Sequence, residues 1–166
     1  MPVSTGIYVG IGSNIGDRLE NLRMAASRLS DISQRIEFSK VYESAASGFS
    51  VQPEFLNVVC KLSTLLTPWD FLEQTRVIEQ SYGRLRVFPN APRFVDIDII
   101  LWGQMRIKTP HLEVPHPRFQ ERAFVLFPLL DLDPFATDPE NGERIDLHVN
   151  QLGKGNAVRM IASFSK

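Results

Sequence analysis

The hydrophobic positions along the chain switch between a period of two and a period of about 3.6, which predicts a mixed α and β protein. Residues 5–13, TGIYVGIGS, alternate and include β-branched side chains, so we expect a strand there. Asp17 is a good N-cap, and residues 18–31 then carry leucines and alanines at helical spacing. The first unit is therefore predicted to be strand, loop and helix.

The same reading predicts two more strands, a second helix and a final strand. Residues 35–44 and 55–65 read as strands joined by a loop of small and turn-forming residues. Thr67 caps a helix that is expected to stop at Gly83, and residues 93–103, RFVDIDIILWG, form the last strand. The order β-α-β-β-α-β predicts an α+β, ferredoxin-like fold, an antiparallel sheet with helices on one face.

The remainder of the chain carries weaker signals. Residues 106–117 read as an irregular connector punctuated by prolines, residues 118–132 as a third helix, and the segment from Asp133 onward has no clear pattern. With 166 residues and no internal repeat or linker, residues 1–166 are expected to form a single domain.

Composition and charge narrow the classes of function. The chain is 43% hydrophobic and 22% charged, typical of a globular domain, and its net charge of −1 provides no overall attraction for nucleic acid or an anionic membrane. No segment is long and apolar enough to suggest a membrane span. The one cysteine, Cys60, lies in an apolar run and is expected to be buried and reduced, which favours the cytoplasm.

The last predicted strand contains two aspartates, Asp96 and Asp98, that leave the strand on the same face. Their backbone anchors are about 6.5 to 7 Å apart, so two ionised carboxylates shielded from water would repel by roughly 2 to 3 kcal/mol. A solvent-exposed face would relieve that repulsion without any function. A divalent cation bound by both carboxylates would relieve it as well.

Arginines flank this strand on both sides. The segment GRLRVFPNAPR contains Arg84, Arg86 and Arg93 without any acid, and Arg118 and Arg122 would share a face if residues 118–132 are helical. Surface loops often carry arginine, and His116 between two prolines could be an ordinary loop histidine. Guanidinium groups beside a cation-binding carboxylate pair also fit polyphosphate chemistry, with a loop able to close over the site.

Familiar nucleotide-binding motifs are absent from the sequence. GIGSNIG, residues 10–16, departs from the dinucleotide-binding fingerprint because Ile15 stands where that motif requires glycine, and no P-loop motif occurs. Gly10, Gly12 and Gly16 would then serve either a sharp turn or a close approach of the backbone to a ligand.

Taken together, the blocks GIGSNIGD, QPEFLNVV, EQSYGRLR, PRFVDIDIILWG and VPHPRFQERAFVLFPLLDLDP resemble the 6-hydroxymethyl-7,8-dihydropterin pyrophosphokinase family. The resemblance covers most of the chain. It implies an enzyme of folate biosynthesis that transfers pyrophosphate from ATP, with two Mg²⁺ ions, to a reduced pterin and releases AMP. It also implies small-molecule partners, and we expect a monomer that binds neither nucleic acid nor a membrane.

The resemblance further implies roles for individual residues. The Mg²⁺ ligands are expected to be Asp96 and Asp98, and the catalytic arginines Arg84, Arg86 and Arg93. Expected around ATP are Glu79, Arg84, Arg93, His116, Arg118 and Arg122. The pterin is expected to contact Gly12, Ser44, Phe55, Asn57 and Phe124, with the two phenylalanines on either side of its ring.

Two departures from the family pattern motivate an alternative. Ser44 and Ala45 replace a Thr-x-Pro-like segment, and Asn90 and Ala91 replace a tryptophan-glycine pair in an arginine loop that is about one residue shorter than in some relatives. Loss of the tryptophan bears on closure of that loop, so the alternative is a catalytically impaired pterin- or nucleotide-binding relative. A ferredoxin-like RNA-binding module ranks last, since the paired aromatic RNA-recognition strands are missing.

Overall fold

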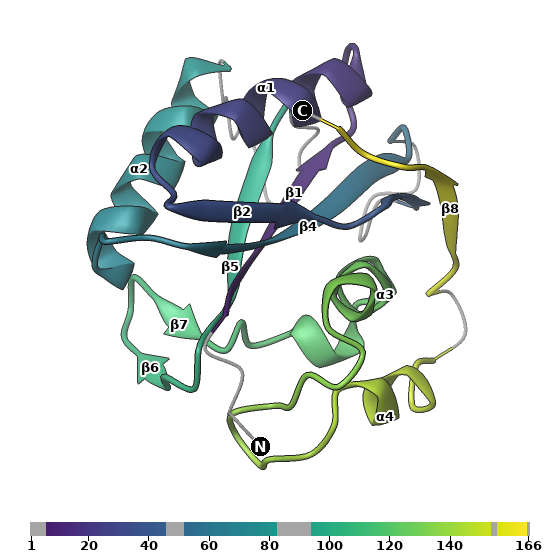
Figure 1. Ribbon diagram of the computed structural model, residues 1–166. Helices are drawn as coiled ribbons and strands as arrows, with labels where there is room; N and C mark the ends of the chain where they lie inside the picture. The colour runs from purple at the N-terminus through teal and green to yellow at the C-terminus, as the bar shows by residue number, and fades with distance from the viewer. Residues whose placement is uncertain (1–5, 46–51, 83–93, 154–155, 166) are drawn as a thin grey trace.

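The computed structural model describes residues 6–45, 52–82, 94–153 and 156–165. Its centre is an antiparallel sheet of six strands in the order β5-β1-β4-β3-β8, with β2 also paired to β4 (Figure 1). The strands of this sheet are β1 (Ile7–Ser13), β2 (Arg35–Phe38), β3 (Val41–Ser44), β4 (Phe55–Ser63), β5 (Asp96–Trp102) and β8 (Val158–Ala162). The helices are α1 (Arg18–Asp31), α2 (Pro68–Ser81), the 3-10 turn η1 (Phe119–Glu121), α3 (Ala123–Leu132) and α4 (Asp146–Val149). The expected ferredoxin-like α+β core is confirmed.

Both predicted helix starts are confirmed, because each cap satisfies a backbone donor of the first turn. The Asp17 carboxylate accepts a hydrogen bond from the Glu20 N–H at 3.1 Å, and the Thr67 hydroxyl accepts from the Asp70 N–H at 3.1 Å. Pro68 occupies the first turn of α2, where its missing N–H costs nothing.

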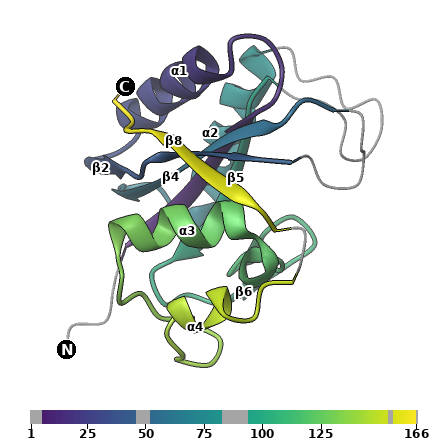
Figure 2. The ribbon, with the colours of Figure 1, turned by 90° about the vertical axis from the view of Figure 1, so that its right-hand side faces the viewer.

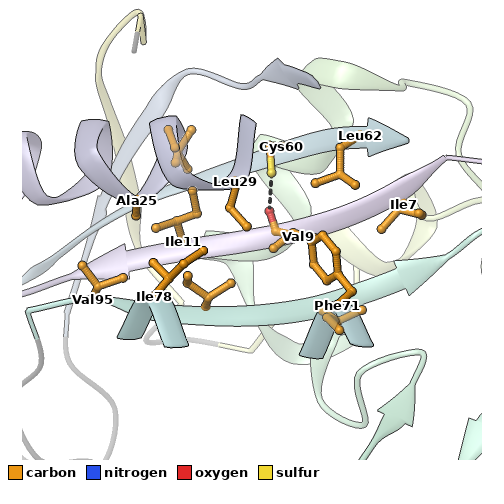
Figure 3. Close-up of a cluster of buried hydrophobic side chains, with 14 of the residues drawn as sticks. Ile7, Val9, Ile11, Ala25, Leu29, Cys60, Leu62, Phe71, Ile78 and Val95 are labelled. Atoms are coloured by element: carbon orange, nitrogen blue, oxygen red, sulfur yellow. Dashed lines mark hydrogen bonds between the residues drawn. The ribbon is translucent and has the colours of Figure 1, made fainter. Parts of the chain in front are cut away.

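One face of the sheet packs against α1 and α2. Ile7, Val9 and Ile11 of the central strand β1 point to this side and lie in one cluster with Ala25 and Leu29 of α1 and with Phe71 and Ile78 of α2 (Figure 3). Cys60 lies in the same core with no exposed surface, and its thiol donates to the Val9 carbonyl at 3.5 Å. The prediction of a buried cysteine is confirmed, and burial raises the pKa of this thiol to about 12.

The opposite face is covered too, which differs from the prediction of helices on one face only. Helix α3 packs against β3 and β4, with α4 beyond it, so the sheet lies between two helical layers (Figure 2). Tyr8, Val59 and Ile100 face this second core. Helix α3 is apolar on most of its surface, as expected for a helix buried between other elements.

Residues 35–44 form two strands instead of one. Ser39 lies between β2 and β3, and its N–H donates to the Val59 carbonyl at 2.8 Å while its hydroxyl accepts from the Val59 N–H at 2.9 Å. Phe38 pairs with Cys60 but Tyr42 pairs with Asn57, so this side contains one residue more than β4, which defines a β-bulge. The bulge changes the register that brings β3 to the candidate site.

The segments after β5 also differ from prediction. The connector contains a small two-stranded sheet of β6 (Ile107–Lys108) and β7 (Glu113–Val114). Residues 118–132 are divided into η1 and α3, because Arg122 adopts an extended backbone with φ −110° and ψ 101°. Strand β8, from the segment without a clear pattern, completes the sheet beside β3.

No helix in the ranges that the structure describes has both the length and the apolar character that crossing a membrane would require.

Candidate active site

The predicted site residues converge where four strands begin or end, on the face of the sheet that also carries α3. Gly12 in β1 lies opposite Asn57 of β4 on one side and opposite Asp96 of β5 on the other. Residues directly opposite each other in an antiparallel sheet point to the same face. Asn57 and Asp96 therefore share one face, two strand spacings or roughly 10 Å apart, with a glycine between them.

Both aspartates face a glycine in the neighbouring strand. Asp96 lies opposite Gly12 and Asp98 opposite Gly10, so β1 contributes no side chain beside either carboxylate. The side chain of Asp98 is 40% exposed. This arrangement gives the glycines of residues 10–16 two separate uses. Gly10 and Gly12 allow neighbouring side chains to approach β1 closely, since a Cβ would lie 3.3 Å from Ile100 at position 10 and 3.3 Å from Asn57 at position 12, while Gly16, with φ +72°, forms the turn before α1.

Arg122 is the cation that the structure brings to this pair. Its Nη1 lies 3.8 Å from Asp98 Oδ2, and its guanidinium lies 5.5 Å from the centre of the Phe124 ring. Burial lowers the pKa of Arg122, while Asp98 opposes that shift. A guanidinium remains charged under such a shift, so Arg122 presents a partly desolvated positive charge to any anion bound beside the aspartates.

His116, which lies near Arg122 and Asp96, is held in place by two hydrogen bonds. Its backbone N–H donates to the Ile100 carbonyl at 2.9 Å, and its Nδ1 accepts from the Arg118 N–H at 3.1 Å. Burial lowers the pKa of His116 to about 4, with Arg122 adding to the effect and Asp96 opposing it. The imidazole is therefore neutral near pH 7, and with Nδ1 acting as acceptor its proton resides on Nε2.

This assignment predicts the titration of His116. We expect its ring protons to titrate in NMR with a midpoint near 4, against an ordinary value of 6.5. Because the folded-state pKa is lowered, the neutral imidazole favours the folded state above pH 6.5, and this contribution declines as the pH falls from 6.5 towards 4. A midpoint for His116 at or above 6.5 would contradict the described environment.

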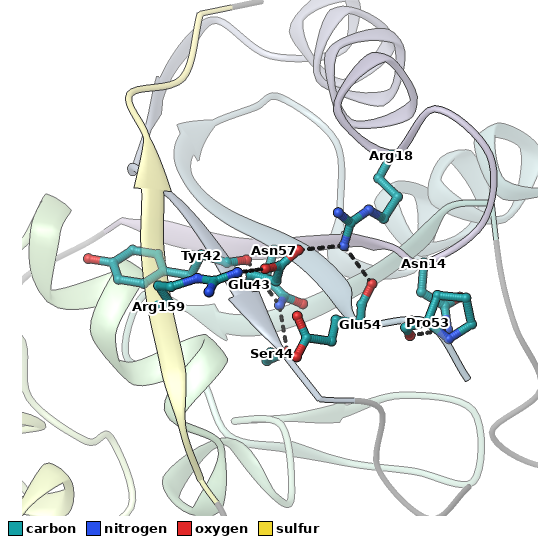
Figure 4. A network of polar contacts seen from close by, with 9 residues as sticks. All are labelled: Asn14, Arg18, Tyr42, Glu43, Ser44, Pro53, Glu54, Asn57 and Arg159. Atoms are coloured by element: carbon teal, nitrogen blue, oxygen red, sulfur yellow. Dashed lines mark hydrogen bonds and ion pairs between the residues drawn. The ribbon is translucent and has the colours of Figure 1, made fainter. Parts of the chain in front are cut away.

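The second part of the site is a polar cluster of Gly12, Ser44, Phe55 and Asn57. Asn57 is buried, and its amide donates to Ser44 Oγ at 2.8 Å and to the Tyr42 carbonyl at 3.4 Å (Figure 4). A Cβ at Gly12 would approach Asn57 Oδ1 to 3.3 Å and the Phe55 ring to 3.4 Å. The hydroxyl of Ser44 thus orients the amide. Four of the five residues predicted for the pterin lie together here, and Phe124 is in the first turn of α3 beside Arg122.

An outer network of charges joins the segments that surround this cluster. Arg18 Nη1 contacts Glu43 Oε2 and the Glu54 carbonyl, each at 2.8 Å, and Arg159 of β8 pairs with Glu43 from the other side (Figure 4). The Arg18 guanidinium lowers the pKa of Glu43. Asn14 donates to the Pro53 carbonyl at 3.3 Å. These contacts connect the start of α1 and the final strand, β8, to the start of β4 at Phe55.

The remaining predicted residues have different surroundings. Glu79 is buried on α2, and its Oε1 accepts from the Ile97 N–H at 3.3 Å, between the two aspartates, so it fixes the edge of β5 against the helix. Arg118 is exposed and pairs with Glu121 at 3.4 Å. The condition under which Arg118 and Arg122 would share a helical face is not met, because the chain is extended at Arg122. The positions outside the described residues are Arg84, Arg86, Asn90, Ala91 and Arg93.

Several contributors around the site had no recognisable signal in the sequence. Arg18, Glu43 and Arg159 read as ordinary surface charges, and Tyr42 as a strand aromatic. Tyr42 donates its hydroxyl to Asp131 of α3 at 2.8 Å, and burial together with this carboxylate raises the pKa of Tyr42. Tyr42 therefore remains protonated and holds α3 against β3. Arg18 and Arg159 are 141 residues apart in the sequence, so no local pattern could connect the residues of this network.

Asp96 and Asp98 are the residues proposed to bind a metal ion, and their surroundings favour one type of metal site. Across the ranges 6–45, 52–82, 94–153 and 156–165, no group of three or more His, Cys, Asp or Glu side chains is placed to hold a metal ion. Such a closed cage is typical of structural Zn²⁺ sites. Mg²⁺ instead is usually held by one or two carboxylates, with water and substrate phosphates as the other ligands. Asp96 and Asp98 on one face, beside Arg122, fit the second type.

Comparisons with known proteins identify the family of this chain. The model of the 7,8-dihydro-6-hydroxymethylpterin-pyrophosphokinase (HPPK) family matches residues 8–134. The 2-amino-4-hydroxy-6-hydroxymethyldihydropteridine pyrophosphokinase of Aquifex aeolicus is 40% identical over 133 residues, which cover 80% of this chain and 83% of that protein. The Bacillus subtilis protein of the same name is 41% identical over 127 residues, covering 75% of this chain and 76% of its own length.

Longer proteins contain a similar region. The folic acid synthesis protein FOL1 of Dictyostelium discoideum is 42% identical over 133 residues, and this chain spans 20% of its length. A crystal structure of Plasmodium falciparum HPPK-DHPS with pteroate superposes with a TM-score of 0.69 at 14% identity, covering 88% of this chain and 42% of that one, which shows the shared fold. The chain therefore belongs to the 7,8-dihydro-6-hydroxymethylpterin-pyrophosphokinase family, the diphosphotransferases of folate biosynthesis.

Proposed function

We propose that this chain transfers the terminal pyrophosphate of ATP to 6-hydroxymethyl-7,8-dihydropterin at the site described, giving the pterin diphosphate and AMP. One observation carries the proposal. Asn57, Gly12 and Asp96 occupy one lateral row of the sheet, so a side-chain amide able to hydrogen-bond a flat ring adjoins a carboxylate pair. The spacing of roughly 10 Å along this row suits a pterin whose hydroxymethyl group reaches towards bound phosphates.

In this proposal the pterin lies against Gly12 and between the rings of Phe55 and Phe124. Asn57, oriented by Ser44, exchanges hydrogen bonds with the ring edge, and removing the ring from water favours binding through its apolar faces. A side chain at position 12 would occupy the same space, since a Cβ there already approaches both Asn57 and Phe55. The glycine thus allows close approach of the ring to β1.

The triphosphate of ATP lies on the other side of Gly12 in this proposal. Arg122 supplies positive charge to its oxygens, and the Nε2–H of neutral His116 donates a hydrogen bond to the nucleotide. Arg118 adds charge at the exposed rim, and Glu79 keeps the aspartate strand in place. Arg84, Arg86 and Arg93, which lie outside the described residues, are proposed as the catalytic arginines from the family resemblance.

Asp96 and Asp98 would hold two Mg²⁺ ions, which when bound supply positive charge that offsets charge on the transferred pyrophosphate. The chain's own contribution is to orient the reactants, because pyrophosphate transfer depends on positioning and charge neutralisation. Residues on rigid strands meet that need better than residues on loops, and Gly12, Asn57 and both aspartates are all on strands.

Phosphorus NMR of the protein with ATP, Mg²⁺ and the hydroxymethyl dihydropterin tests the proposal directly. We expect resonances of AMP and of a pterin diphosphate to appear together, in equal amounts, as ATP is consumed. ADP as the only nucleotide product would contradict pyrophosphate transfer. Tight binding of both substrates in calorimetry without any AMP would favour the catalytically impaired alternative.

A further inference from the structure

Two buried polar side chains, Asp138 and His148, lie beside η1 in the layer that contains α3 and α4, beyond the matched family region of residues 8–134. Asp138 has no exposed surface and His148 is 6% exposed. Burying a carboxylate is unfavourable unless its oxygens accept hydrogen bonds. The partners of Asp138 therefore indicate what this arrangement holds together.

The two carboxylate oxygens of Asp138 have different partners. Oδ1 accepts from the Glu140 N–H at 2.9 Å and so stabilises the turn that follows. Oδ2 lies 3.2 Å from His148 Nε2 and also accepts a hydrogen bond from the side-chain amide of Gln120. A carboxylate only accepts, so His148 donates through Nε2. One oxygen thus joins α4 to the middle residue of η1.

The neighbouring residue of η1 is fixed by the same histidine. Phe119 is 2% exposed, and its ring meets the imidazole of His148 edge-on, with 6.1 Å between ring centres and an interplanar angle of 85°. Two consecutive residues of η1 are therefore held from the α4 side. Arg118 immediately precedes η1 and Arg122 immediately follows it, so both arginines depend on where η1 lies.

Local backbone structure does not place Arg122 strongly. A 3-10 turn of three residues is short, and neither η1 nor α3 has a side-chain cap bond at its start. Arg122 is also partly desolvated and is repelled by Arg118. Its attraction to Asp98, across 3.8 Å, would be lost by a small shift of η1.

We propose that Asp138, with Gln120 and His148, is a positioning group that holds η1 so that Arg122 meets the phosphates of the nucleotide. The inference rests on the proposed function, because it takes Arg122 to contact ATP. It assigns a role in nucleotide binding to Asp138 and to His148 of α4, although neither side chain is proposed to touch a substrate. A purely structural role would predict lower stability without any selective effect on the nucleotide.

The test compares Gln120→Leu with Ile145→Val in the full chain. Gln120→Leu removes the bond from η1 and leaves the aspartate and histidine in place, while Ile145→Val removes one methylene from the same buried core. Thermal unfolding, the calorimetric Kd for a non-hydrolysable ATP analogue with Mg²⁺, and KM for each substrate are measured for both variants.

We expect Gln120→Leu to raise the Kd of the ATP analogue and the KM for ATP by roughly fivefold to twentyfold, through partial loss of a charge-assisted contact. The KM for the pterin should change by less than about twofold. Ile145→Val should lower the Tm while leaving the affinity for the ATP analogue within about twofold. His148→Leu should resemble Gln120→Leu, and His148→Gln, which keeps a donor, should restore most of the affinity.

Two results would overturn the inference in distinguishable ways. If Gln120→Leu lowers the Tm but binds the ATP analogue as tightly as the unmodified chain, the group has only a structural role. Arg122→Ala is measured alongside. If Arg122→Ala also binds the ATP analogue normally, the assignment of Arg122 to the phosphates is wrong. In that case both the inference and the role of Arg122 in the proposed function must be given up.

Discussion

Replacing Asp98 by alanine is expected to reduce turnover by at least about 10³-fold while leaving the fold intact. Asp98 is 40% exposed and points away from the α1 and α2 core, so its removal creates no cavity in that core. The loss would come from the missing carboxylate, because one aspartate cannot hold the cations that offset charge on the transferred group. A factor of 10³ corresponds to about 4 kcal/mol of transition-state stabilisation.

The measurement is the rate of AMP release at saturating ATP, Mg²⁺ and pterin, with circular dichroism and thermal unfolding as checks on the fold. Asp31→Ala is the matched control, since Asp31 is an exposed aspartate at the far end of α1. It should retain full turnover. Unchanged turnover in Asp98→Ala would end the assignment of this residue as a Mg²⁺ ligand. A parallel loss in the control would point to a general effect of removing acidic charge.

Asn57→Ala is expected to have its largest effect on the pterin, raising its KM by roughly tenfold to a hundredfold. Asn57 is buried, and its amide is oriented by Ser44 Oγ at 2.8 Å. Alanine would leave the hydrogen-bonding edge of the pterin without its partner, which costs about 1 to 3 kcal/mol in a desolvated site. The KM for ATP should change little, because the aspartates lie two strands away.

Steady-state kinetics with each substrate varied in turn measures this selectivity. Asn150→Ala is the control, because Asn150 is an exposed asparagine after α4. An equal rise in both KM values for Asn57→Ala would indicate general distortion of the sheet. An unchanged KM for the pterin would show that the ring binds elsewhere. Ser44→Ala should produce a smaller rise than Asn57→Ala, since it removes the acceptor that orients the amide and not the amide itself.

The helix caps and the strand alternation could be predicted from the sequence because they depend on residues close together in the chain. Asp17 and Thr67 sit where a polar side chain can satisfy the first turn of a helix, and both predicted caps are present. The alternation in residues 93–103 placed Asp96 and Asp98 on one face, and their strand pairing agrees. Family membership was also recognisable, because long blocks of residues keep their order along the chain.

Other features required contacts between distant parts of the chain. The bulge at Ser39 exists because a hydroxyl and a backbone N–H both bond to Val59, 20 residues away. The helix predicted for residues 118–132 breaks at Arg122, where periodicity favours continuation. Contacts of η1 with Asp138 and His148, together with the pairing of Arg122 and Asp98, accompany the extended backbone.

Periodicity and capping thus specify which helices and strands form and which side chains share a face of each one, because those properties arise within a few residues. The meeting of Asn57, Gly12 and Asp96 in one row depends on strand register. The position of Arg122 depends on α4, whose His148 lies 26 residues further along the chain. Hydrogen bonds between strands and burial of polar groups against distant partners set these relations, so the tertiary structure alone decides how the site is assembled.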